Sequence, residues 1–182
     1  MDERELIAGC IRKDNAARRY LYEFYARPML GVCYRYTDNR QVSEDLLHDG
    51  FIRVFESIGA FEYRGKGSLK AWISKIFVNV SLEYLRANAQ KPTAPLEEWT
   101  SSEAFREEEL ETVPTDVLMR FITELPTGYR TVFNLYVFEE MPHREIARLL
   151  HINEASSRSQ LARAKSLLAK KIGEYINSGD GE

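Results

Sequence analysis

Arginines and small polar side chains gather between residues 154 and 165, with the types and spacing that suit contact with DNA. At about 100° per residue on a helix, five of them lie on the outward side or its flank: Ser156, Arg158, Ser159, Ala162 and Arg163. Small side chains allow close approach to a major groove, and arginine bonds guanine edges or phosphates. A solvated face of an ordinary bundle helix carries the same residue types. The pattern alone therefore leaves both interpretations open.

The charge pattern adds a second feature, because the net charge of −3 hides two basic stretches. Residues 63–91 hold six bases and one acid, and residues 141–172 hold seven bases and two acids. Residues 91–115, between them, carry a net charge of −5. Two basic patches separated by an acidic segment are compatible with nucleic-acid binding, which the overall charge would otherwise disfavour.

Residues that could support enzyme or metal chemistry are sparse. The three histidines, His48, His143 and His151, are expected on separate elements. Cys10 and Cys33 have no second Cys or His at ligand spacing, which argues against a disulfide framework or a zinc site. The stretch from Gly65 to Ser68 lacks the spacing and the strand of a phosphate-binding loop. We therefore expect no catalysis, no metal, no cofactor and no small-molecule substrate.

Apolar periodicity predicts an all-α fold. The 182 residues suffice for one medium or two small domains, and no apolar stretch is long enough to cross a bilayer. No secretory signal is apparent, so we expect a cytoplasmic protein. Steps of three and four residues predict a helix around Tyr20–Tyr36 that includes Tyr20 and Phe24 in its apolar stripe, a break at Thr37–Asn39, and helices over about 43–58 and 69–87. Residues 59–68 hold three glycines and are expected to form an exposed loop.

The last third predicts a helix-turn-helix. After stripes at 117–125 and at 132–137, the latter including Tyr136 and Val137, a short helix from Pro142 to Leu150 is followed by a three-residue turn. Asn153 is a good N-cap for a helix to about Ile176, and its predicted inner face is Ser157, Leu161, Ala164, Leu168 and Ile172. We divide the chain into helical domains at 1–87 and 115–177, an acidic linker at 88–114 and a tail at 178–182.

The whole chain resembles the extracytoplasmic-function (ECF) sigma factors, promoter-specificity subunits of bacterial RNA polymerase. The segment ELPTGYRTVFNLYVFEEMPHREIARLLHINEASSRSQLARAKSLL is similar to their −35-recognition region. SEDLLHDGFIRVF resembles their polymerase-docking helix, and GSLKAWISKIFVNVSLEYLR resembles their −10-recognition segment. A helix-turn-helix alone is common. The N-terminal and C-terminal segments in this order, with a linker between them, are specific for this family.

The resemblance implies a role for each group of residues. The outward residues of the last helix would contact the −35 element. The loop after the docking helix would capture a base flipped from the non-template strand, where aromatic stacking contributes about 1–3 kcal/mol per base. The implied −10 residues are Phe61, Tyr63, Arg64, Lys66, Ser68, Lys70, Lys75 and Asn79. Asp45, His48, Asp49 and Arg53 would contact polymerase.

The implied partners are core RNA polymerase, promoter DNA and an anti-sigma protein. The linker would lie in the polymerase cleft, although a plain solvated tether has the same composition. Two other classes remain open at this point. A stand-alone regulator would use only the helix-turn-helix, with the N-terminal bundle as a sensor, and a helical adaptor would bind only protein.

Five positions depart from the family pattern, and one of them is His48, where a glutamine is usual. His151 stands where a glycine is frequent, and a left-handed conformation there would be strained. Ser157 replaces a common valine, and we expect its hydroxyl to bond to the carbonyl of Asn153. Gln160 lowers the positive charge of the last helix, and Gly50 would weaken the docking helix by up to about 1 kcal/mol relative to alanine.

Overall fold

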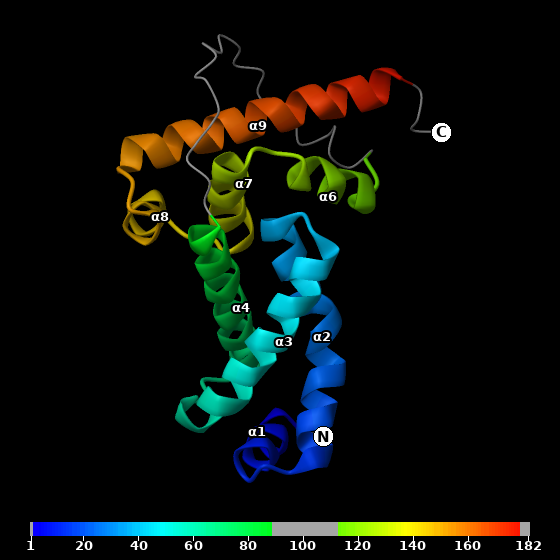
Figure 1. The fold of residues 1–182 in the computed structure, drawn as a ribbon, viewed down its shortest axis with the longest axis vertical. Helices are drawn as coiled ribbons and strands as arrows, with labels where there is room; N and C mark the ends of the chain where they lie inside the picture. Colours follow the sequence, from blue (N-terminus) through cyan, green and yellow to red (C-terminus); the bar gives the residue numbers. More distant parts are fainter. Residues whose placement is uncertain (1, 89–112, 179–182) are drawn as a thin grey trace. The chain divides into compact units, whose positions relative to one another are not determined.

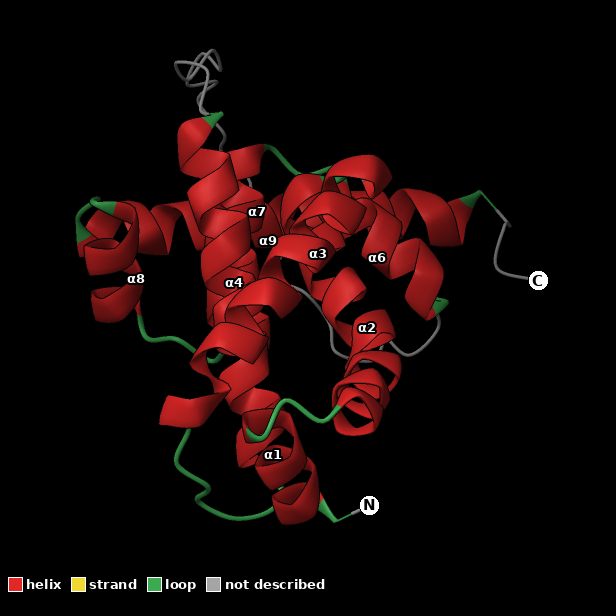
Figure 2. Cartoon of the chain, turned by 60° about the horizontal axis from the view of Figure 1, so that its bottom comes forward, coloured by secondary structure: helices red, strands yellow, loops and turns green. Residues whose placement is uncertain are grey.

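The described part of the chain, residues 2–88 and 113–178 of a computed structural model, consists of helices joined by loops, with no strand (Figures 1 and 2). The prediction of an all-α fold is confirmed. The chain divides into two compact units, unit 1 (Met1–Pro92) and unit 2 (Thr93–Glu182), each described below by itself. The predicted linker lies almost wholly outside the described residues.

Within residues 2–88, unit 1 contains four α-helices and a short 3-10 turn: α1 (Glu3–Ile11), α2 (Asn15–Thr37), α3 (Arg40–Ser57), η1 (Ile58–Ala60) and α4 (Ser68–Ala87). Side chains cap the first three helices, as Asp2, Asp14 and Asn39 accept hydrogen bonds from backbone N–H groups of the first turn. The predicted break between α2 and α3 is confirmed. There Asp38 adopts a left-handed φ of 50°, and Asn39 caps the next helix. That helix begins at Arg40, three residues earlier than expected.

The core of unit 1 is formed where α2, α3 and α4 pack side by side (Figure 1). Its fully buried members include Leu21, Tyr36, Val54, Ile73 and Phe77. The helical pattern was wrong about part of α2, because Tyr20 and Phe24 point outward and Phe24 is 62% exposed. They lie one turn apart on the solvent side, with their rings stacked at 6.3 Å.

Gly50 has a packing role that the sequence did not indicate. A Cβ at this position would lie 2.3 Å from Cε1 of Phe77, so α3 and α4 approach closely only because residue 50 has no side chain. Its cost to helix propensity is offset by this contact. The contact joins two residues that are 27 positions apart and belong to different helices. The sequence indicated only the loss of helix propensity at Gly50.

The described residues of unit 2, 113–178, form α6 (Thr115–Thr123), α7 (Thr127–Phe133), a π-helical turn η2 (Asn134–Phe138), α8 (His143–Leu150) and α9 (Glu154–Asn177). The other helices pack against α9 or one another (Figure 1). The predicted helix-turn-helix is confirmed: His151 ends α8 in the left-handed region at φ 56°, and Asn153 caps α9 by accepting from the N–H of Ser156. Pro142 is the N-cap of α8 rather than its first residue.

The core of unit 2 lies along α9. All five residues predicted for its inner face are buried: Ser157, Leu161, Ala164, Leu168 and Ile172. The apolar stripe over 132–137 was wrong in its second half, because Tyr136 and Val137 are 38% and 42% exposed. The π-helical turn explains this difference, since an i→i+5 bond from Glu139 N–H to the Asn134 carbonyl changes the helical period there.

Candidate nucleic-acid interfaces

The N-terminal half of α9 presents one candidate surface, here called the α9 surface. Arg158, Ser159 and Ala162 are exposed, and Ser156 is half-buried. The guanidinium of Arg158 bonds to the carboxylate of Glu154 at 3.2 Å on the exposed side of the helix. Exposed ion pairs contribute little to stability, so Arg158 can exchange Glu154 for a phosphate or a guanine at small cost.

Arg163, the fifth predicted residue, is more constrained than its position on a helical wheel indicates. It is half-buried, and its Nη1 donates a hydrogen bond to the hydroxyl of Tyr129 at 3.3 Å. Tyr129 belongs to α7, 34 residues earlier. The sequence had no signal for this pairing. A guanidinium has five N–H donors, so one such bond leaves others for DNA.

Ser157 lies on the buried side of the same helix, and its predicted bond was wrong. Its hydroxyl is 2.8 Å from Nδ1 of His143, the first residue of α8, and does not bond to the Asn153 carbonyl. The ring of Tyr136 stacks on His143, with centroids 4.7 Å apart and planes 23° from parallel. Burial lowers the pKa of His143, and the positive charges of Arg158 and Lys165 add to this lowering. The sequence placed His143 on a separate element and missed this contact.

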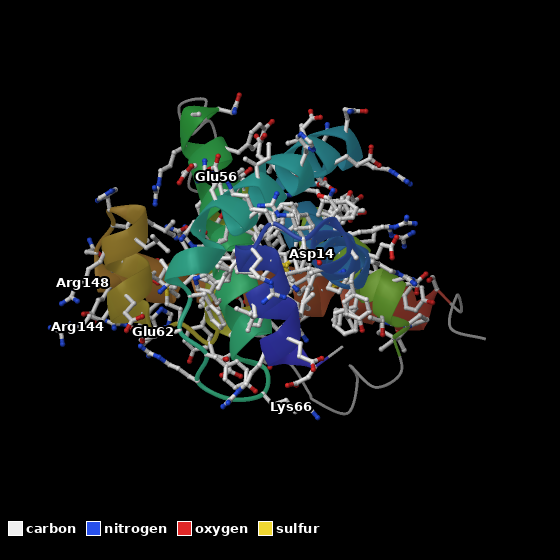
Figure 3. All side chains as sticks on the ribbon, turned by 90° about the horizontal axis from the view of Figure 1, so that it is seen from below. Asp14, Glu56, Glu62, Lys66, Arg144 and Arg148 are labelled. Atoms are coloured by element: carbon white, nitrogen blue, oxygen red, sulfur yellow. The ribbon has the colours of Figure 1, made fainter. Side chains whose placement is uncertain are left out.

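The 61–68 loop of unit 1 presents a second candidate surface. Gly65 and Gly67 have φ of 114° and 90°, which other residues rarely adopt. Ser68 closes the loop: its hydroxyl donates to the Gly65 carbonyl at 2.7 Å and accepts from the Arg64 N–H at 3.2 Å. Ser68 thus shapes the loop, while Lys66 projects outward from it (Figure 3).

The two aromatic residues of the loop are half-buried and already have partners. The ring of Phe61 lies 5.0 Å from that of Trp72 in α4, with planes 44° apart. The guanidinium of Arg4 in α1 lies 4.8 Å from the ring centre of Tyr63. Trp72 is itself half-buried, so the loop packs against a partly exposed aromatic side chain.

The predicted polar residues of α4 do not share one face. Lys70, Lys75 and Asn79 are all exposed. Lys75 and Asn79 are one turn apart and lie together, whereas Lys70 is about 140° around the helix from Lys75. Lys70 belongs to the first turn of α4, beside the end of the loop, so it extends the loop surface rather than the helix face.

The exposed face of α3 combines charge with one apolar residue. Asp45, His48 and Asp49 are exposed, and Ile52 is 43% exposed at the helical spacing that places it beside them. The predicted Arg53 instead bonds to Glu83 of α4 through two contacts of 2.7 and 3.0 Å. This bond lowers the pKa of Glu83. Ile52 was missed, although an isoleucine three residues after Asp49 and seven after Asp45 was a usable signal.

The described ranges contain neither a metal-binding cluster nor a helix that could span a membrane. Among residues 2–88 and 113–178, no three or more His, Cys, Asp or Glu side chains gather as they would around a metal ion. None of the helices described there has the length and apolarity that crossing a membrane requires.

Comparison with known proteins gives these surfaces a context. The family model for sigma-70 region 2 matches residues 21–91, and the one for sigma-70 region 4 matches residues 115–168. The chain belongs to the sigma-70 family. The loop, α4 and the α3 face fall within the region 2 match, and the α9 surface falls within region 4.

Individual relatives narrow the assignment. The chain is 24% identical over 159 residues to the ECF RNA polymerase sigma factor SigM of Bacillus subtilis, covering 86% of this chain and 96% of that protein. It is 27% identical over 175 residues to the SigM protein of Mycobacterium tuberculosis, covering 96% and 86%. The chain is therefore an ECF sigma factor, which directs RNA polymerase to specific promoters. The stand-alone regulator and the adaptor are excluded as interpretations of the whole chain.

Solved structures agree on the fold. CnrH, solved in complex with the cytosolic domain of CnrY, matches with a TM-score of 0.52 and 18% identity over 94% of this chain and 97% of that one. RpoE of Bartonella quintana, solved in complex with the anti-sigma factor NepR, matches with a TM-score of 0.50 and 13% identity over 86% and 96%. At these identities the likeness concerns the fold alone.

Proposed function

We propose that the two units of this sigma factor divide the promoter between them. Unit 2 binds the −35 element through the α9 surface, and unit 1 binds polymerase through α3 and the melted −10 strand through the 61–68 loop and α4. The observation that carries this proposal is that both basic surfaces are exposed, one along a helix and the other on a glycine-rich loop. In this proposal residues 1–87 bind polymerase and the −10 strand, residues 88–114 link the two domains, and residues 115–177 bind the −35 element.

The α9 surface suits a duplex. Three of its members, Arg158, Ser159 and Ala162, are exposed along successive turns at the N-terminal end of a 24-residue helix. That end of a recognition helix contacts base edges in the major groove. Arginine donates to guanine or phosphate, serine to either, and alanine allows close approach and contacts a thymine methyl.

The 61–68 loop suits single-stranded DNA. Lys66 and Arg64 are exposed cations, Phe61 is half-buried beside Trp72, and Tyr63 is half-buried with Arg4 over its ring. A displaced base that stacks on an aromatic face, with a cation near its phosphate, is stabilised whatever its sequence context. Trapping unstacked bases offsets the cost of melting, so opening the duplex needs no covalent step. Accordingly, we assign the chain no catalysis and no cofactor.

The α3 face suits a protein partner. Ile52 is an exposed apolar residue with charged neighbours around it, the arrangement of an interface centre with a polar rim. Asp45, His48 and Asp49 would form that rim. Arg53, the fourth predicted residue, is also exposed, and its bond to Glu83 ties α3 to α4.

Two further elements of the proposal rest on the relatives. RpoE was solved in complex with the anti-sigma factor NepR, and CnrH with the cytosolic domain of CnrY. We extend to this chain an anti-sigma partner of the same general kind. Because polymerase and promoter DNA are its other partners, we place its activity in the cytoplasm.

Transcription with core polymerase on a promoter library tests the proposal. With the chain present, we expect run-off products from a small set of promoters that share −35 and −10 sequences. Arg163→Ala should cost about 1–3 kcal/mol in −35 binding and so lower promoter output, with the exposed Arg120→Ala in α6 as its control. Asp49→Arg should abolish co-purification with core polymerase, whereas Glu23→Arg, at an exposed position of α2, should not.

Two results would contradict this division. Unchanged promoter output from Arg163→Ala would remove that residue from the −35 contact. Co-purification of Asp49→Arg with core polymerase at the wild-type level would mean that the docking face lies elsewhere.

A further inference from the structure

A polar contact joins the two helices of the helix-turn-helix from inside. Nδ1 of His143, at the start of α8, lies 2.8 Å from the hydroxyl of Ser157 in the first turn of α9. Ser157 is fully buried, whereas the rest of that face of α9 is apolar. A buried hydroxyl without a partner is destabilising, so this pairing constrains where α8 and α9 meet.

His143 is also held on a second side. Tyr136, from the π-helical turn η2, stacks on its ring at 4.7 Å, and the ammonium of Lys165 in α9 lies 5.9 Å from the Tyr136 ring centre. Stacking restricts the ring plane of His143, and the hydrogen bond to Ser157 fixes the direction of Nδ1 within that plane. Three elements, η2, α8 and α9, are therefore aligned through one imidazole.

The position of Ser157 matters because of the residues beside it in the sequence. Ser156 and Arg158 flank Ser157 directly, and both belong to the α9 surface. A shift of Ser157 relative to α8 would carry these two side chains with it. Hydrogen bonds require donor–acceptor distances defined within a few tenths of an ångström, so such a shift alters which base edges they reach.

We propose that His143 and Ser157 are positioning residues for promoter recognition, and that their hydrogen bond sets the −35 base preference by fixing how α9 is presented to the groove. This inference rests on the proposed role of unit 2. Neither residue touches DNA. Both act through Ser156 and Arg158.

The chemistry of the pair suggests a sharp set of variants. Ser157→Ala removes the hydroxyl and keeps the imidazole. His143→Phe keeps an aromatic ring for Tyr136 but loses Nδ1, whereas His143→Asn loses the ring and keeps an oxygen near the place of Nδ1. The double variant, which combines His143→Phe with Ser157→Ala, removes both polar partners, and such a paired removal is close to neutral for folding.

Ser81 offers a matched control. It is a fully buried serine of α4 in unit 1, and its hydroxyl donates to the Phe77 carbonyl of its own helix at 2.9 Å. Ser81→Ala therefore deletes a buried hydroxyl without changing a contact between helices of unit 2. Any effect on −35 preference that it shares with Ser157→Ala reflects lost folding rather than lost positioning.

The experiment is selection from a library randomised at the −35 element, using the full chain bound to core polymerase, with thermal unfolding of each variant measured in parallel. We expect Ser157→Ala, His143→Phe and their double variant to reduce discrimination against non-selected sequences about tenfold, and to a similar extent, because they break one shared contact. His143→Asn should retain most of the discrimination. Ser81→Ala should leave it within about twofold.

The possible failures are distinguishable. If the wild-type chain selects no −35 sequence, the proposed role of unit 2 is wrong and the inference falls with it. If the wild-type chain selects one sequence and the double variant, folded to the same degree, selects it with equal discrimination, only the inference is overturned. Loss of discrimination by Ser81→Ala equal to that of Ser157→Ala would also overturn it.

Discussion

The two units hold their candidate DNA contacts by different means. Unit 1 is joined by close apolar packing, as at Gly50 and Phe77, and presents its contacts on a loop shaped by its own serine. Unit 2 has an apolar core along α9 as well, and buried polar contacts between its elements add to that core. Arg130 of α7, a buried arginine, donates to the carbonyl of Thr123 at the end of α6, and His143 bonds to Ser157.

This difference matches the two forms of DNA that the units are proposed to bind. A groove of duplex DNA demands a rigid helix at a defined angle, and directional hydrogen bonds specify angles better than apolar contacts do. A melted strand is itself flexible. The 61–68 loop, which packs against the side chain of Trp72, can therefore bind it without a fixed angle. Apolar packing then needs only to keep the bundle of unit 1 together.

The largest effect is expected where the packing of unit 1 is closest. Gly50→Leu should cost about 3 kcal/mol or more, because the new side chain would collide with the buried ring of Phe77. Gly31→Leu is the matched control, since nothing lies within 4 Å of a Cβ there. Its better helix propensity should gain up to about 0.8 kcal/mol. Hydrogen exchange of unit 1 peptides measures both, and equal effects would contradict the packing described for Gly50.

A somewhat smaller effect is expected from the polar ties of unit 2. Arg130→Met should cost about 2 kcal/mol, because the buried carbonyl of Thr123 loses a charged donor. Arg120→Met, on the exposed side of α6, should stay within about 0.5 kcal/mol of wild type. Hydrogen exchange in peptides of α6 and α7 measures the stability lost in each of the two variants. If Arg130→Met were as stable as its control, the contrast between the units would not hold.

The smallest effect concerns pH and separates the units again. Since burial and the charges of Arg158 and Lys165 lower the pKa of His143, with Glu154 opposing them, folding favours the neutral imidazole. Its contribution to stability is complete above the ordinary pKa of 6.5 and is lost as the pH falls through the lower folded value. Unit 2 should therefore lose stability on acidification, and His143→Asn should remove that component. Hydrogen exchange at several pH values tests this, and an identical pH profile for the variant would refute it.

Residues that follow a helical period were predictable from the sequence, and residues that meet across elements were not. The buried face of α9 and the left-handed His151 follow from local spacing and turn chemistry. The exposure of Tyr136 depends on the π-helical bond from Glu139 to Asn134, and the spacing of apolar residues does not predict that bond.

The same limit applies within the candidate sites. Exposure of Asp45, His48 and Asp49 could be predicted from the helix wheel, whereas the bond from Arg53 to Glu83 spans 30 residues. The bond from Arg163 to Tyr129 spans 34. Such partners depend on how helices pack, and a periodic pattern specifies which face is buried without specifying what covers it.

Permanganate footprinting of thymines around position −10 tests the division of labour most directly. Core polymerase would be loaded with the wild-type chain, with Lys66→Ala, or with Arg158→Ala, on a duplex promoter selected by the wild type and on the same promoter already forked at −10. We predict that Lys66→Ala weakens opening on the duplex and capture on the fork alike. Arg158→Ala should weaken opening only on the duplex. Equal loss on the fork from Arg158→Ala, or no loss there from Lys66→Ala, would contradict the account.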